Sequence, residues 1–139
     1  MYERILVGID GSDASREALD EAVTLASHVG ATVHIVMVVE PQPMTTMFGV
    51  DEVDALNQAV EEVVQDVLSE HTDTEVDLVG DVRRGRPARA LLQYAHDHEI
   101  DAIVVGRSGS HDLGDAILGS TTDRLARSTD VPLHIIPKA

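Results

Sequence analysis

The fold of this chain is decided by the stretch Val104-Val105-Gly106-Arg107-Ser108-Gly109, followed after nine residues by Gly119-Ser120-Thr121. An apolar run that ends in glycine is typical of a buried strand, and the Gly-Ser pair is typical of a helix start. Bare backbone N–H groups at such a strand end and helix start bind anions. The stretch therefore predicts a phosphate-binding turn between a strand and a helix.

Apolar periodicity predicts that strands and helices alternate along a single domain, residues 1–139. We expect strands over residues 5–9, 32–39, 75–82, 100–105 and 133–136, with the third at an exposed edge. We expect helices over residues 14–29, 51–70, 87–98 and 120–128, with a loop or a mobile lid at 44–50. Ser12 is the expected N-cap and Gly30 the expected C′ residue of the first helix. This order predicts an α/β fold, a doubly wound five-stranded parallel sheet with helices on both faces.

The composition of the chain, above all its acidic charge, limits which partners it can bind. The formal net charge is −15, and Lys138 is the only lysine, so we expect no binding to nucleic acid or to an anionic membrane. The excess of acid over lysine resembles proteins of salt-loving microbes, with an ordinary acidic protein as the alternative. The absence of cysteine excludes disulfides and thiolate chemistry. The first residues lead directly into a strand, so we expect a cytoplasmic protein without a signal peptide or a membrane span.

Several known catalytic motifs are missing from the sequence. There is no Walker A motif, no Gly-x-Gly-x-x-Gly after the first strand and no Gly-x-Ser-x-Gly elbow. The seven histidines show no spacing typical of a metal site; His96 and His98 leave their helix on different sides. We expect no catalytic residues, and at most weak ATP hydrolysis. A phosphoacceptor receiver domain is disfavoured because paired acids after the first strand are lacking.

The spacing Gly-x-x-Gly-x9-Gly-Ser, with Val7-Gly8-Ile9-Asp10-Gly11-Ser12 at the first strand, resembles the universal stress protein family over the whole chain. The resemblance implies the strand order 3-2-1-4-5, which periodicity alone does not distinguish from 2-1-3-4-5. It also implies a stress-response regulatory module that binds an adenine nucleotide, ATP being expected, at the carboxyl ends of the first and fourth strands. Family members pair through the last strand, so we expect a homodimer through Leu133–Ile136.

Ten residues would contact the nucleotide according to this resemblance: Gly8, Asp10, Val38, Val105, Gly106, Arg107, Gly109, Gly119, Ser120 and Thr121. The alternative for Asp10 is a helix cap, and for Val38 it is ordinary core packing. Gly106 and Gly109 would permit a positive φ and close approach of a ligand. Gly119 and Ser120 would present N–H groups, although Ser120 and Asp123 also have the spacing of a capping box.

The chain departs from the family between the two glycine clusters. Many members carry basic residues where this chain has Ser110 and His111, followed by Asp112 and Asp115. An acid about 7 Å from a phosphate charge would cost roughly 2 kcal/mol at an effective dielectric near 20. Concentrated salt would screen this repulsion, or a Mg²⁺ ion could bridge Asp112 or Asp115 to the phosphates. A dimeric interaction scaffold that has lost nucleotide binding is the alternative function.

Arginines gather just before the third helix, at Arg83, Arg84, Arg86 and Arg89. Such a cluster could contact an anion or a partner protein. The alternative, which we favour, is a solvated turn whose arginines pair with neighbouring acids. Arg107, inside the glycine-rich stretch, is the better candidate for a phosphate contact.

Overall fold

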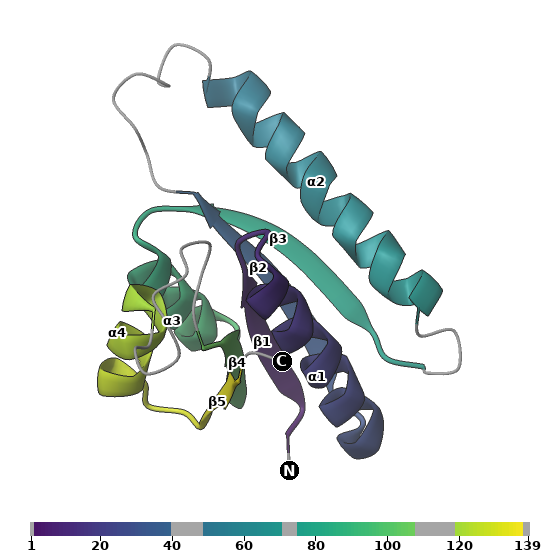
Figure 1. Cartoon of the computed structure of the whole chain (residues 1–139), viewed down its shortest axis with the longest axis vertical. Coiled ribbons are helices and arrows are strands. Elements are labelled where there is room, and N and C mark those ends of the chain that lie inside the picture. Colours follow the sequence, from purple (N-terminus) through teal and green to yellow (C-terminus); the bar gives the residue numbers. More distant parts are fainter. Residues whose placement is uncertain (1, 40–48, 71–74, 108–118, 138–139) are drawn as a thin grey trace.

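The computed structural model describes residues 2–39, 49–70, 75–107 and 119–137, in which strands and helices alternate (Figure 1). The strands are β1 (Arg4–Ile9), β2 (Thr32–Val39), β3 (Leu78–Arg84), β4 (Ala102–Gly106) and β5 (Leu133–Ile136). The helices are α1 (Asp13–Val29), α2 (Gly49–Glu70), α3 (Pro87–Asp97) and α4 (Ser120–Ser128). No helix in these ranges is both long and apolar enough to cross a membrane.

The strands form one parallel sheet in the order β3-β2-β1-β4-β5, which confirms the expected topology. In the pairing of β1 with β4, Val7 lies opposite Val104. Each strand continues two residues beyond this pair, to Ile9 and to Gly106, so their carboxyl ends lie level at one edge. The chain leaves β1 toward β2 on one side and β4 toward β5 on the other, which makes this edge the switch point of the sheet.

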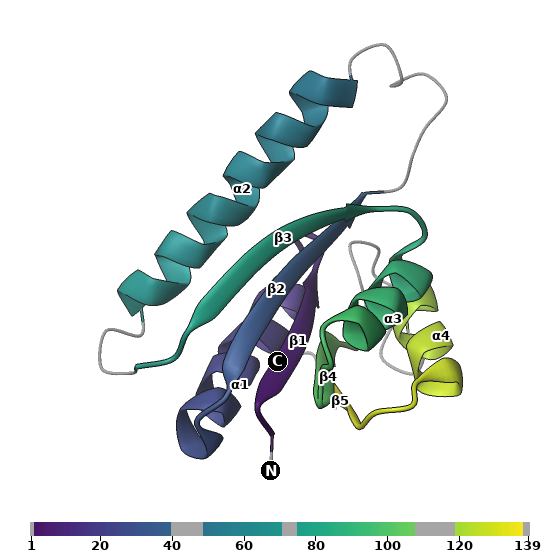
Figure 2. The same cartoon turned by 180° about the vertical axis from the view of Figure 1, so that it is seen from behind.

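Helices lie on both faces of the sheet (Figures 1 and 2), and an apolar core fills the space between the sheet and the helices on each face. On one face α1 packs on the side chains of Ile5 and Val7, and α2 adds Val63 and Val64. On the other face α3 and α4 pack around Leu6. Successive residues of β1 point to opposite faces, as expected for a strand that is buried on both sides.

Local sequence sets both ends of α1, as expected. The Oγ of Ser12 accepts a hydrogen bond from the N–H of Ser15 at 3.1 Å, which caps the first turn. Gly30 adopts φ 74°, and its N–H donates to the carbonyl of Ala26 at 2.8 Å. Both predicted caps of this helix are confirmed.

Several predicted boundaries were wrong by a few residues. Strand β3 spans Leu78–Arg84 rather than 75–82, because it pairs with β2 as far as Val39. Strand β4 begins at Ala102 and includes Gly106. Helix α2 begins at Gly49, inside the segment predicted as a loop, and α3 ends at Asp97, one residue before the predicted end. The ends of these elements depend on contacts with neighbouring strands and helices, so they differ from the ends that apolar periodicity predicts.

Candidate functional site

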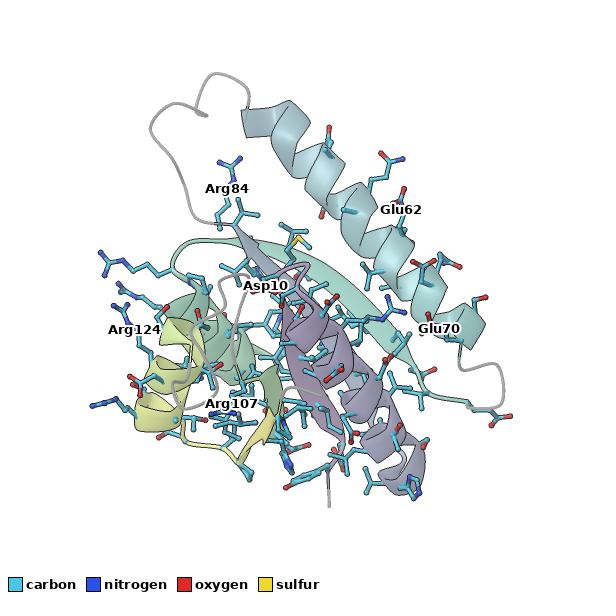
Figure 3. The ribbon with its side chains drawn as sticks, in the orientation of Figure 1. Asp10, Glu62, Glu70, Arg84, Arg107 and Arg124 are labelled. Carbon is cyan, nitrogen blue, oxygen red and sulfur yellow. The ribbon has the colours of Figure 1, made fainter. Side chains whose placement is uncertain are left out.

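The turn between β1 and α1 is built around Asp10. One carboxylate oxygen of Asp10 accepts the N–H of Ser12 at 2.9 Å, and the N–H of Asp10 donates to the Oγ of Ser15 at 3.3 Å. Gly11 allows the turn by adopting φ 84°. Ser12, not Asp10, caps α1. Asp10 is exposed, and its second carboxylate oxygen has no partner among the described residues, so it is available to accept a hydrogen bond (Figure 3).

Gly106 is required by packing, which sequence reasoning did not recognise. A Cβ at this position would lie 2.8 Å from the backbone carbon and oxygen of Ala14 in the first turn of α1. Gly106 does not have a positive φ, so that part of the prediction was wrong. The missing side chain lets α1 approach the end of β4 and thereby brings the β1–α1 turn close to the switch point.

The start of α4 differs from the expected capping box. Gly119 is the N-cap, and no side chain of the residues that the structure describes caps the helix. The Asp123 carboxylate instead binds the Nε of Arg127 at 3.1 Å, so the predicted Ser120–Asp123 box was wrong. The N–H of Gly119 donates to the carbonyl of Arg107 at 2.9 Å and is not available to a ligand. The first-turn amides of residues 120–122 have no intrahelical acceptor, and no side chain in the described ranges caps them, so they are candidate donors to a ligand.

Thr122 is a site residue that sequence reasoning missed. Its hydroxyl donates to the carbonyl of Gly106 at 2.8 Å, in a buried position. This bond fixes the first turn of α4 against the last residue of β4. The available signal was helical spacing, because Thr122 and the fully buried Leu125 lie three residues apart on the core-facing side.

Arg107 continues β4 by donating its N–H to the carbonyl of Ile136 at 3.0 Å. Its side chain is partly exposed and lies toward α4 and β5, apart from Asp10 (Figure 3). Val105 is 5% exposed and belongs to the core beneath α3 and α4, and Val38 packs against the same core. Gly8 faces Leu91 of α3, whose Cδ1 would lie 2.9 Å from an added Cβ. For these three residues the core-packing role is the one that the contacts support.

The structure therefore brings Asp10, Gly106 and the start of α4 to one edge of the sheet. Gly109, Ser110, His111, Asp112 and Asp115 lie outside the described residues, and with them the proposed Mg²⁺ bridge. Within the described ranges, no three acidic or histidine side chains gather where they could hold a metal ion.

Side chains of β2, β3 and α3 form a polar cluster between the sheet and α3. The buried His34 Nδ1 is 2.7 Å from the hydroxyl of Tyr94, whose ring stacks on His98 with centroids 3.9 Å apart. Burial, followed by the positive charges of His98 and Arg4, lowers the pKa of His34. Burial, followed by the charge of Asp81, raises the pKa of Tyr94. Both changes favour the neutral forms of this pair.

Arg83 and Arg84 belong to β3 rather than to a solvated turn. Arg83 binds Asp81 at 3.1 Å, and its guanidinium carbon lies 5.1 Å from the centre of the Tyr94 ring. The expected ion pairing is thus confirmed for Arg83. Arg86 and Arg89, the other members of the predicted cluster, lie on a different surface at the start of α3.

A parallel sheet in this order, with helices on both faces, defines a doubly wound α/β domain, a class that binds ligands at the switch point. The model of the universal stress protein family matches residues 1–137, and the chain belongs to that family. Universal stress protein YxiE of Bacillus subtilis is 29% identical over 147 residues, which cover 98% of this chain and 99% of the relative.

Solved structures of the family share the fold. UspA from Lactobacillus plantarum superposes with a TM-score of 0.84 at 27% identity, and the match covers 97% of each chain. A universal stress protein solved in complex with cAMP has a TM-score of 0.76 at 24% identity, and the match covers 99% of each chain. These similarities extend along nearly the whole chain.

Proposed function

We propose that this protein is a stress-response regulatory module that binds an adenine nucleotide, with ATP as the expected ligand, at the carboxyl ends of β1 and β4. The observation that carries the proposal is the first turn of α4, whose N–H groups have no side-chain acceptor among the described residues. Such amides, with the positive end of the helix dipole, favour a phosphate group. On the neighbouring strand, the available carboxylate oxygen of Asp10 is suited to accept a ribose hydroxyl.

The solved relative in complex with cAMP supports the choice of ligand class. cAMP and ATP share adenine, ribose and a phosphate group. Both would therefore use a hydroxyl acceptor at the end of β1 and amide donors at the start of α4. Which of them this chain prefers depends on how many phosphates the segment after β4 accommodates.

The proposal includes a cytoplasmic homodimer that pairs through β5, the last strand at its edge of the sheet. It also includes a surface suited to concentrated salt, on the strength of the net charge of −15. Mg²⁺ at Asp112 or Asp115 would supply the positive charge that basic residues supply in other members. ATP affinity that is unchanged by a chelator would reject the metal.

The test compares two single-charge variants, Asp10→Ala and Asp13→Ala, by calorimetric titration with ATP. Both carboxylates are exposed and lie in the same turn region, so each variant removes one negative charge from the same surroundings. We expect Asp10→Ala to weaken ATP binding by about tenfold or more, because a charged hydrogen bond is lost, and Asp13→Ala to leave it nearly unchanged. Equal affinities in the two variants would contradict the assigned role of Asp10.

A third variant, Asp10→Asn, retains an oxygen for the N–H of Ser12 while removing the charge. It separates loss of the turn from loss of the ligand contact. If Asp10→Asn keeps the melting temperature of the wild type and still weakens ATP binding as much as Asp10→Ala does, loss of the ligand contact rather than of the turn is responsible.

A further inference from the structure

A second candidate binding site lies between α3 and α4. A groove of about 440 Å³ is lined by residues of both helices: Arg86, Arg89, Leu92, Gln93, Arg124 and Ser128. Its volume is within the range of roughly 300–1,000 Å³ that is typical of small-molecule sites. None of these residues belongs to the expected nucleotide site. Figure 3 shows Arg124 on the outer side of α4, pointing away from Asp10 and the switch point.

The groove gathers positive charge that no acidic residue of the described ranges neutralises by an ion pair. The chain has only ten Lys and Arg residues against 25 Asp and Glu. Other arginines in the described ranges form ion pairs with carboxylates: Arg4, Arg16, Arg83 and Arg127. Arg86, Arg89 and Arg124 have no such partner within those ranges, although acids outnumber cations by more than two to one. Within the part of the chain that the structure describes, three guanidinium groups without an acidic partner thus gather around one hollow.

The remaining lining of the groove suits an organic anion. Ala88, which is 6% exposed, and the half-buried Leu92 provide an apolar floor, while Gln93 and Ser128 add neutral hydrogen-bonding groups. Guanidinium groups bind phosphate and carboxylate oxygens in pairs, with two parallel N–H donors for each anionic group. An apolar floor with charged groups at the rim fits a compact molecule that carries its charges at the ends of a short framework.

We propose that the α3–α4 groove binds a small polyanion with at least two phosphate or carboxylate groups. Arginines from both helices line the groove, so a molecule with two anionic groups can engage α3 and α4 together, one group for each helix. A large polyanion such as nucleic acid is disfavoured, because the net charge of −15 would repel its flanking phosphates.

The test titrates the full chain with pyrophosphate, with citrate and with inorganic phosphate at low ionic strength, using calorimetry. We expect pyrophosphate or citrate to bind more tightly than inorganic phosphate, because each carries two or more anionic groups that can pair with arginines of both helices. The two probes distinguish the anionic groups of the ligand. Binding of pyrophosphate but not citrate indicates a phosphate ligand, and binding of citrate but not pyrophosphate indicates a polycarboxylate. Binding of both indicates that the groove selects its ligand by negative charge and not by the type of anionic group.

The variant Arg86→Gln/Arg89→Gln/Arg124→Gln should weaken binding of the preferred probe by about tenfold or more. The matched control is Arg127→Gln, which removes an exposed arginine of α4 that does not line the groove and should change affinity less than twofold. All of these side chains are exposed, so the melting temperature should stay near that of the wild type.

Two results would overturn the proposal. The first is no binding of either polyanion by the wild-type chain at low salt. The second is unchanged binding in the triple arginine variant, above all if ATP competes with the probe, because the anion would then occupy the start of α4. Failure of ATP binding leaves the groove proposal standing, since its probes and variants do not involve the nucleotide site.

Discussion

The substitution Gly106→Ala tests directly whether close packing, rather than ligand approach, requires glycine at the end of β4. A Cβ at Gly106 would lie 2.8 Å from the backbone carbon and oxygen of Ala14, and backbone atoms in a helix cannot move aside cheaply. Relieving this overlap requires α1 to shift relative to the sheet. Overpacking of this kind costs about 1–3 kcal/mol. For a chain of this size, about 2 kcal/mol lowers the melting temperature by roughly 6–8 °C.

Gly8→Ala is the matched control for this substitution. Its added Cβ would lie 2.9 Å from the Cδ1 of Leu91, the end of a flexible side chain that can turn away. Because alanine also restricts the unfolded chain, by about 0.4–1 kcal/mol, we expect Gly8→Ala to change stability little. Thermal unfolding without nucleotide measures both effects. A Gly106→Ala variant as stable as wild type would refute the packing argument and restore ligand approach as the reason for the glycine.

Three further predictions concern the polar contacts and the exposed sheet edge. Thr122→Val should lower the free energy of unfolding by about 1 kcal/mol in denaturant titrations, since the buried carbonyl of Gly106 loses its donor, whereas Thr121→Val should not. Because burial holds the pKa of His34 below the unfolded value of about 6.5, the unfolded state binds more protons below that pH. The free energy of unfolding should therefore fall as pH drops below about 6.5, by at most about 1.4 kcal/mol per unit, and His34→Gln should flatten this dependence. Light scattering should give twice the chain mass of 15.0 kDa if β5 pairs with its counterpart; a monomer at micromolar concentration would contradict the homodimer.

The order of elements and the caps of α1 could be predicted because they depend on local patterns. Ser12 and Gly30 show the residue types that helix ends require, and the apolar runs are short and well separated. The order of the strands in the sheet, in contrast, could not be predicted from local patterns. Periodicity allowed two orders, and the correct one came from the family resemblance alone.

The roles of individual site residues were harder to predict, because they depend on contacts between distant parts of the chain. Gly106 is glycine on account of Ala14, which lies 92 positions earlier, and no local pattern reveals that pairing. The α3–α4 groove likewise joins Arg86 and Arg89 to Arg124, which belongs to another helix. Sequence clustering had grouped the first two with Arg83, although the fold places Arg83 on β3 against Tyr94.

The most direct test of the proposed nucleotide site is a titration of isotopically labelled protein with ATP, followed by amide resonances in dilute and in concentrated salt. Nucleotide binding at this site predicts shifts that saturate with ATP and concentrate at Ser120, Thr121 and Thr122 and in the turn at Asp10, with tighter binding in concentrated salt. The scaffold alternative predicts no shifts under either condition. Absence of shifts, or shifts confined to the α3–α4 groove, would contradict nucleotide binding at the carboxyl ends of β1 and β4.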